Sequence, residues 1–353
     1  MRAMLARLLT VAVLLLAPQL LFSAEERIRI VANDAARRVD VLIDGAPYTS
    51  YIYPTSLKKP VLYPLRTARG TTVTRGFPLE PRAGERVDHP HHAGLWFQHG
   101  DVNGLDFWNN STEIGPDRAP KMGTILHRRV VEAKSGADRG ELAVETDWVD
   151  PQGTVLLREA TRFVFRGAKD MRSVDRITTL TATGQRVTLR DNKEGVLGMR
   201  VVRALEQPAD KPEVFSDASG KPTAVPKLDN TGVTGIYASS EGLKGDAVWG
   251  TRGRWVTLQG TVEKEPVTLL MLDHPGNPGF PTYWHARGYG LFAANPLGRK
   301  VFDDKQPELV ITLEPSQSIT FRHRVLILSN TWSTAATERE YRNFAEGVSG
   351  LRH

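Results

Sequence analysis

Alternation of apolar and polar residues with a period of two is the feature that most constrains this chain. It recurs from residue 27 to residue 328, and such a pattern places every second side chain on the same face of an extended strand. Segments with the 3.6-residue period of a helix are missing over most of the sequence. The pattern therefore predicts an all-β fold. The expected strands are residues 27–31, 38–43, 141–149, 154–165, 173–183, 186–190, 255–262, 267–272, 308–313 and 318–328.

Short turn signals separate several of these segments. Asp150-Pro151-Gln152-Gly153 and Gly184-Gln185 each stand between two expected strands and predict antiparallel neighbours. Because the helices that parallel crossovers require are missing, we expect a large antiparallel β-sandwich. Near the C-terminus, Tyr341, Phe344, Ala345 and Val348 recur on one helical face, and residues 337–340 have the spacing of a capping box. They predict one short C-terminal helix.

The first 24 residues have the pattern of a secretory signal peptide. Arg2 and Arg7 precede an apolar run over residues 8–16, and we expect cleavage after Ala24. No later stretch approaches the roughly 20 apolar residues of a membrane helix, so no membrane partner is expected after cleavage. We expect a periplasmic or secreted protein whose residues 25–353 form a single β-sandwich domain, with residues 207–233 and 274–281 as long loops inside it.

Composition excludes several kinds of chemistry. The chain has no cysteine, which rules out disulfides, thiolate metal centres and a cysteine nucleophile. Its 46 Lys and Arg only slightly exceed its 40 Asp and Glu, and they are dispersed, so nucleic acid is not an expected partner. Any catalysis must use His, carboxylates, hydroxyls, Lys or Arg.

Histidine clusters in two segments that also hold aromatic residues and glycine. Four of the nine histidines fall between residues 89 and 99, and two more fall between residues 272 and 290. A sugar site has this mixture, because aromatic faces pack on the C–H surfaces of a sugar ring while imidazole, carboxylate and guanidinium groups bind its hydroxyls. We expect the two segments to converge on one pocket for a small-molecule or oligosaccharide substrate, with His99 and His285 within about one sugar ring of each other.

Roles within the expected site follow from side-chain chemistry. Imidazoles titrate near neutral pH, carboxylates orient them or share their protons, and a guanidinium can clamp a carboxylate or stabilise an oxyanion. The expected catalytic residues are His92, His99, His285, Glu194 and Asp101. The expected substrate-binding residues are His91, Asn103, Trp108, His274, Trp284 and Arg287.

Two other interpretations use the same residues. Clustered histidines with an acid nearby can hold a divalent metal such as zinc, iron or manganese, so the cofactor is left unknown with a His-bound metal as one possibility. The same cleft would also serve a carbohydrate-binding domain without catalysis. For Trp96 and Phe107, a place in the hydrophobic core is the favoured interpretation.

At these residues the sequence resembles a bacterial family of secreted domains of unknown function that carries the legacy label "methane oxygenase PmoA". The resemblance covers about residues 30–330. The matching blocks are 91–92, 95–97, 99–104 and 106–108; 193–195 and 198; and 273–275, 277–278, 284–285, 287, 289–290 and 295–298. The label itself does not fit, because the membrane methane monooxygenase is built on transmembrane helices and this chain has none after its signal.

A weaker likeness over residues 60–96 is to galactose-mutarotase-like supersandwich proteins. It implies a large antiparallel supersandwich, and the family context implies sugar degradation. The Asn-His-x-Tyr-Phe type of motif found in true mutarotases is not visible, so their His and Glu roles do not carry over. We expect a periplasmic carbohydrate-active enzyme that applies His/Glu acid-base chemistry to a sugar or oxidised glycoside, as an epimerase, lyase or hydrolase.

Overall fold

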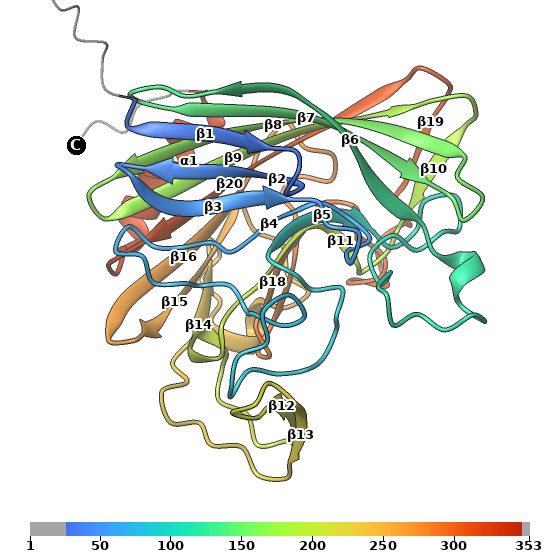
Figure 1. Ribbon diagram of the computed structural model, residues 1–353. Coiled ribbons are helices and arrows are strands. Elements are labelled where there is room, and N and C mark those ends of the chain that lie inside the picture. Colours follow the sequence, from blue (N-terminus) through green and yellow to red (C-terminus); the bar gives the residue numbers. More distant parts are fainter. Residues whose placement is uncertain (1–25, 348–353) are drawn as a thin grey trace, which may run out of the picture.

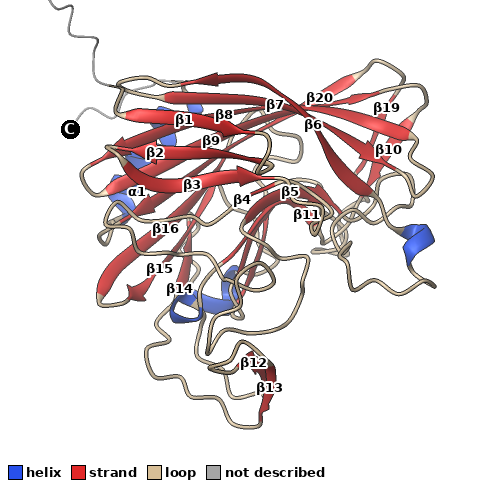
Figure 2. Ribbon diagram, in the orientation of Figure 1, coloured by secondary structure: helices blue, strands red, loops and turns tan. Residues whose placement is uncertain are grey.

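Two eight-stranded antiparallel sheets form the body of the protein in the computed structural model, which describes residues 26–347 (Figures 1 and 2). Sheet 1 has the order β1 (Ile28–Asn33), β2 (Arg38–Ile43), β3 (Ala46–Ile52), β4 (Val61–Leu62), β5 (Leu95–His99), β11 (Gly195–Arg200), β18 (Leu291–Asn295) and β17 (Tyr283–Arg287). Sheet 2 has the order β14 (Ile236–Ser239), β15 (Trp255–Val262), β16 (Glu265–Asp273), β20 (Ser318–Leu328), β9 (Met171–Ala182), β8 (Val155–Ala168), β7 (Gly140–Val149) and β6 (Thr124–Lys134). The predicted antiparallel β-sandwich is confirmed.

Smaller elements extend from the two sheets. They are the pair β10 (Val187–Arg190) and β19 (Val310–Leu313), the pair β12 (Glu213–Ser216) and β13 (Pro222–Val225), the short 3-10 helices η1 (Ala119–Lys121), η2 (Arg203–Leu205) and η3 (Gly245–Val248), and the helix α1 (Thr334–Ala345). None of the helices within residues 26–347 has the length and apolar content needed to cross a membrane.

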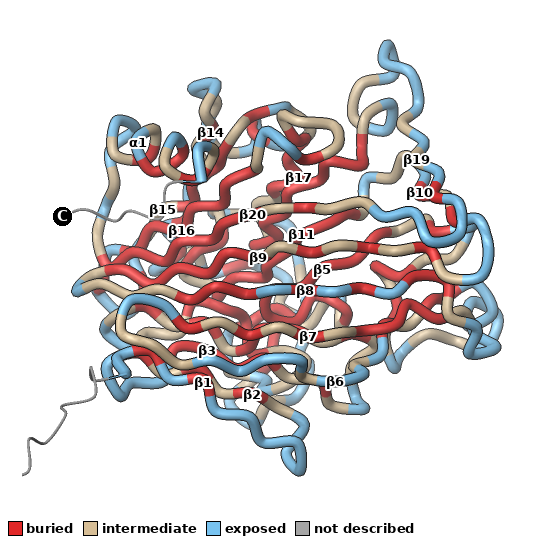
Figure 3. Tube along the Cα trace, turned by 90° about the horizontal axis from the view of Figure 1, so that it is seen from above, coloured by how far each residue is buried: buried red, intermediate tan, exposed pale blue. Residues whose placement is uncertain are grey.

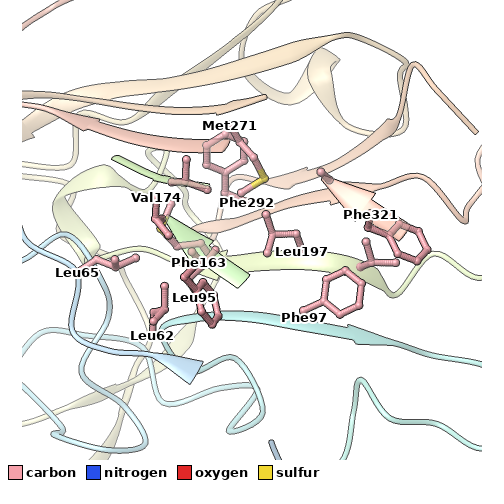
Figure 4. Close-up of a cluster of buried hydrophobic side chains, with 14 of the residues drawn as sticks. Leu62, Leu65, Leu95, Phe97, Phe163, Val174, Leu197, Met271, Phe292 and Phe321 are labelled. Carbon is pink, nitrogen blue, oxygen red and sulfur yellow. The ribbon is translucent and has the colours of Figure 1, made fainter. Parts of the chain in front are cut away.

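The hydrophobic core lies between the inner faces of the two sheets. Leu95, Phe97, Leu197 and Phe292 of sheet 1 meet residues of sheet 2 there (Figure 4). The sheet 2 residues labelled in that view are Phe163, Val174, Met271 and Phe321. Burial is greatest along the middle of the strands, and exposed residues gather in the outer loops and edge strands (Figure 3).

The opposite, outer face of sheet 1 is covered by a second cluster. Side chains alternate along β5, so Leu95 and Phe97 face the core while Trp96 faces outward. Trp96 packs there with Trp108, Leu291 and Ala293. Because both faces of β5 are covered, all five of its residues are buried and show no polar alternation. The expected strands did not include residues 95–99, which form β5.

Two local predictions also need correction. β10 pairs with β19 and not with β9, so Gly184-Gln185 does not close a hairpin. Helix α1 begins earlier than the expected capping box, because Ser333 is the N-cap and its hydroxyl accepts the Ala336 N–H at 3.3 Å. Thr337 lies inside the helix. The expected signal peptide and Val348 lie outside the described residues.

Candidate functional site

Four aromatic rings stack in a row on the outer face of sheet 1. His89 stacks on Tyr289 with 5.3 Å between ring centroids and on His92 with 4.8 Å, and His92 stacks on Trp96 at 5.0 Å. His89 adopts a left-handed backbone conformation with φ of 46°, which non-glycine residues adopt infrequently. The row runs from the buried Trp96 through His92 and the half-exposed His89 to Tyr289.

Two buried arginines fix this row in place. Arg200 is fully buried, donates to Asp88 Oδ1 at 2.7 Å, and holds its guanidinium 4.7 Å from the centre of the Tyr289 ring. Arg75 is also buried; it pairs with the same Asp88 oxygen and donates to the carbonyls of His89 and His92 at 3.1 and 3.2 Å. The Asp88 carboxylate thus pairs with both guanidiniums, and these contacts hold the loop that contains His89 and His92.

The contact with Arg200 determines which ring nitrogen of His92 carries the hydrogen. Arg200 Nη1 lies 3.1 Å from His92 Nδ1. Because a guanidinium can only donate, Nδ1 is the acceptor and the ring hydrogen is on Nε2. Burial, together with the neighbouring His91 and Arg200, holds the pKa of His92 well below its ordinary value. His92 is therefore a neutral, buried support of the ring stack.

Glu194 and His285 form a carboxylate–imidazole pair beside the stack. His285 Nδ1 lies 3.0 Å from the Lys193 carbonyl and 3.7 Å from Glu194 Oε2. The carbonyl can only accept, so Nδ1 carries the hydrogen and Nε2 carries the lone pair. No residue in the described part of the chain bonds to that Nε2. Burial and the cationic Lys193 and Arg287 lower the pKa of His285 to about 3.

An exposed aromatic and cationic rim borders this pair. The Arg287 guanidinium lies 5.1 Å from the centre of the Trp249 ring and 5.8 Å from that of Tyr289. Trp249 keeps 39 % of its surface exposed. We name Glu194, His285, Arg287, Tyr289, His89 and Trp249 the outer site.

Strand alternation explains why the pair faces outward. His285 and Arg287 alternate along β17 with Trp284 and Ala286, which belong to the core cluster. Glu194 immediately precedes β11, which lies two places from β17 in sheet 1, with β18 between them. Two segments about 90 residues apart in sequence thereby bring an acid and an imidazole together.

The structure does not bring His99 into this group. His99 has the same parity along β5 as Leu95 and Phe97, so it lies on the inner side of the sheet while His285 lies on the outer side. Its Nε2 donates to the Arg190 carbonyl at 2.7 Å, and its Nδ1 is buried with no partner among the described residues. We therefore do not assign His99 to the acid-base pair with Glu194 and His285.

Asp101 and Asn103 have turn-forming contacts. Asp101 Oδ1 accepts the Gly104 N–H at 2.9 Å. Asn103 Oδ1 accepts the Thr188 N–H at 2.8 Å, and its amide donates to the Arg186 carbonyl at 3.1 Å, which ties the turn to β10. These contacts explain both side chains without a ligand.

The remaining expected site residues divide between the core and distant surfaces. Trp284 is fully buried and donates to the Gly253 carbonyl at 3.0 Å, and Trp108 is buried against Trp96. His274 packs its ring against Phe344 of α1, with 5.2 Å between centroids. His91 is buried beside His92. Of the eleven expected residues, the outer site contains Glu194, His285 and Arg287.

Sequence reasoning missed several contributors to the site. His89 and Tyr289 stand inside the two dense segments, so their composition could have identified them. Arg200, Arg75 and Trp249 lie in other segments with no local signal. Only the fold brings these three to the outer face of sheet 1.

The described residues do not form a metal centre of the ordinary kind. Within residues 26–347, no group of three or more His, Asp or Glu side chains is arranged to hold a metal ion. The stacked His89 and His92 make ring contacts in place of converging lone pairs.

Solved structures with similar shape include proteins whose titles name carbohydrate chemistry. A GH36 α-galactosidase from Geobacillus stearothermophilus is 12 % identical with a TM-score of 0.40, over 85 % of this chain and 41 % of the galactosidase. A galactose mutarotase-like protein from Clostridium acetobutylicum is 9 % identical with a TM-score of 0.39, over 86 % of this chain and 98 % of that protein. A heparan sulfate lyase from Pedobacter heparinus is 8 % identical with a TM-score of 0.33, over 84 % of this chain and 34 % of the lyase. This chain thus spans about two fifths of the galactosidase. TM-scores this low carry no inference about its function.

The sequence comparison with protein families gives a firmer result. Among curated proteins, none matches the sequence significantly. A family model described as a family of unknown function, DUF6807, matches residues 38–342, from β2 to α1. The PmoA label is not part of that description. Because the match covers most of the chain, this protein belongs to the family of unknown function DUF6807.

Proposed function

We propose that this protein is a carbohydrate-active enzyme, an epimerase or lyase that removes a proton from a sugar bound at the outer site. The observation that carries the proposal is the Glu194–His285 pair, whose imidazole presents its Nε2 lone pair beside a cationic and aromatic rim. The apolar run over residues 8–16 supports our further proposal that the protein acts in the periplasm.

His285 has the protonation state of a general base. Its Nδ1–H is directed at the Lys193 carbonyl, so Nε2 is the atom that would take a proton. The pKa of about 3 keeps the ring neutral at pH 7. When Nε2 accepts a proton, the Glu194 carboxylate 3.7 Å from Nδ1 stabilises the imidazolium that forms.

Arg287 supplies charge where a proton abstraction needs it. Removing a proton next to a carbonyl or carboxylate leaves negative charge on oxygen, and a guanidinium at the rim stabilises that charge. A two-carboxylate hydrolase would need a second available acid beside Glu194. Asp88 is the carboxylate of the neighbouring ring stack, and it is held by Arg75, Arg200 and His89. Proton abstraction therefore fits the geometry better than hydrolysis.

The rim explains the choice of a sugar. Trp249 offers a partly exposed aromatic ring, and Arg287 beside it offers hydrogen-bond donors for hydroxyl or carboxylate oxygens. A sugar ring presents both kinds of surface. We propose that the ring packs on Trp249 with its acidic C–H directed at His285 Nε2.

Solvent exchange tests this proposal directly. Purified mature protein is incubated in D₂O with a panel of neutral sugars, uronic acids and 3-keto glycosides, and C–H signals are followed by proton NMR. We expect at least one sugar to exchange a ring proton or to be converted. His285→Gln should lower that rate by roughly 10² to 10⁴, because the group that takes the proton is lost. The wild-type rate should not fall between pH 7 and pH 5, since His285 stays neutral over that range.

His274→Gln is the matched control, because His274 packs against Phe344 of α1 and belongs to no part of the outer site. Its exchange rate should equal that of the wild type. Equal loss in both variants would contradict the assignment of His285. Binding of a sugar by calorimetry without exchange or conversion of any substrate would instead favour the carbohydrate-binding domain.

A further inference from the structure

Lys59 is a buried cation that the outer site does not use. It lies just before β4, only 3 % of it is exposed, and its ammonium donates to the His91 carbonyl. The ammonium also lies 5.4 Å from the centre of the Trp96 ring. Within residues 26–347 it forms no ion pair. A buried ammonium without a carboxylate partner is costly, because desolvation is not repaid.

A cavity of about 180 Å³ opens beside Lys59. Lys59, His91 and the loop that contains Asn110, Ser111 and Thr112 line it. The Nε2 atom of His91 is buried and has no hydrogen-bond partner among the described residues. Lys59, whose ammonium has no carboxylate partner, and His91, whose Nε2 has no hydrogen-bond partner among the described residues, thus line the same small cavity.

Of the carboxylates that the structure describes near this cavity, none forms an ion pair with Lys59. Four titratable groups face Lys59 or share the cavity with it: His91, Asp106, Glu113 and Lys58. Burial and the nearby Lys59 lower the pKa of His91 to about 2, so His91 is neutral. Asp106 accepts hydrogen bonds from the backbone and side chain of Asn109, at 2.9 and 2.7 Å, and Glu113 is exposed. Neither pairs with the Lys59 ammonium.

We propose that this cavity is a second binding site, which takes the carboxylate of a small organic acid as the missing partner of Lys59. The volume suits an acid up to about the size of one sugar acid. The carboxylate accepts from the ammonium, and the Ser111 and Thr112 hydroxyls offer further donors at the cavity wall. This site does not depend on the function proposed for the outer site.

Binding at this cavity should be coupled to protonation. Burial lowers the pKa of Lys59 to about 7, well below the usual value for lysine. The carboxylate binds the ammonium form, so above pH 7 each bound acid must take up a proton. We expect the affinity to fall by up to about tenfold for each pH unit above 7.

The test is isothermal titration calorimetry of the wild-type protein with acetate, glycolate, pyruvate and glucuronate at pH 6 and pH 9, with chloride as the reference anion. One or more of these acids should bind roughly 10- to 100-fold more weakly at pH 9 than at pH 6. At pH 8, the heat should change with the ionisation enthalpy of the buffer, as proton uptake requires. Affinity equal at the two pH values, or no greater than that for chloride, would overturn the proposal.

Three variants locate the site. Lys59→Met should abolish binding of the acid, and Glu113→Gln should tighten it because a like charge is removed from the cavity wall. Lys121→Gln removes the same positive charge from the exposed end of η1 and should leave affinity within about twofold. Unchanged binding of the acid in a folded Lys59→Met protein would refute the assignment of the site to Lys59. If that variant does not fold, the pH dependence of binding to the wild-type protein tests the assignment. Sugar exchange at the outer site is not needed for any of these measurements.

Discussion

A charged pair buried between the two sheets shows how much a single residue can matter to this fold. Arg176 donates to Glu159 Oε1 at 2.5 Å, and its guanidinium lies 4.9 Å from the centre of the Phe97 ring and 5.0 Å from that of Phe163. Glu159 also accepts from the Trp148 indole N–H at 2.8 Å. The pair therefore links both sheets through the middle of the core.

Removing Arg176 should strongly destabilise the protein. Arg176→Met leaves Glu159 as a buried carboxylate without its cation, and we expect the free energy of unfolding to fall by about 3 to 5 kcal/mol. Urea denaturation followed by tryptophan fluorescence measures it. Arg129→Met breaks the exposed pair with Glu145 on β6 and β7 and should leave the midpoint of urea denaturation close to that of the wild type. Similar losses in the two variants would show that burial does not govern the energy of the Arg176 pair.

Residue chemistry could predict part of the site and no more. His285 and Arg287 are expected from a segment that combines reactive groups with aromatic residues and glycine, and Glu194 is expected as a carboxylate that orients an imidazole or shares its proton. His99 stands in an equally dense segment, but strand parity points it toward the core. The strand β5 was not recognised, so that parity could not be applied.

At the scale of elements, one carboxylate organises the loop that follows β18. Asp191 accepts backbone N–H groups from Arg299 at 3.0 Å, Lys300 at 2.8 Å and Leu309 at 2.9 Å. The loop would otherwise leave these amides to solvent. Asp191 also begins the segment that leads to Glu194, so the same contacts brace the approach to the outer site.

Asp191→Ala should therefore loosen this loop without unfolding the sheets. We expect hydrogen exchange at the amides of Arg299, Lys300 and Leu309 to accelerate at least about tenfold, because their charged acceptor is lost. Hydrogen–deuterium exchange read by NMR measures it. Asp303→Ala is the control, since Asp303 accepts only local contacts such as the Lys305 N–H at 3.2 Å. Unchanged exchange at the three amides in Asp191→Ala would contradict this role.

Strands with one polar face were the predictable elements. The bounds of β2, β15 and β20 agree with the expected ranges. Along β2 the side chains alternate strictly between half-buried and buried positions, and β20 alternates over part of its length. β5, β11 and β18 are buried on every residue, so they carry no alternation to detect. β10 alternates, but its partner β19 lies more than 100 residues away, and sequence pattern does not encode that pairing.

At the scale of the whole molecule, the two faces of sheet 1 differ in what covers them. The inner face belongs to the core shared with sheet 2, and the outer face carries the outer site and the Lys59 cavity. The same strands supply both faces, so neighbouring residues along β17 lie alternately in the core and on the outer face. Trp284 packs in the core, and the next residue, His285, faces the site.

Two tryptophans test this difference between the faces of sheet 1, because Trp284 packs in the core and Trp249 lies at the rim of the outer site. Trp284→Ala should lower the free energy of unfolding by about 3 to 5 kcal/mol, since a fully buried indole and its hydrogen bond to the Gly253 carbonyl are lost. Trp249→Ala should lower stability by clearly less than Trp284→Ala, because 39 % of Trp249 is exposed whereas Trp284 is fully buried. Sugar affinity should instead weaken roughly two- to tenfold in Trp249→Ala, as the loss of one stacking face predicts. Urea denaturation and calorimetry with the sugar identified by solvent exchange give the two readouts. A large stability loss with unchanged affinity in Trp249→Ala would place that ring in the fold and remove it from the outer site.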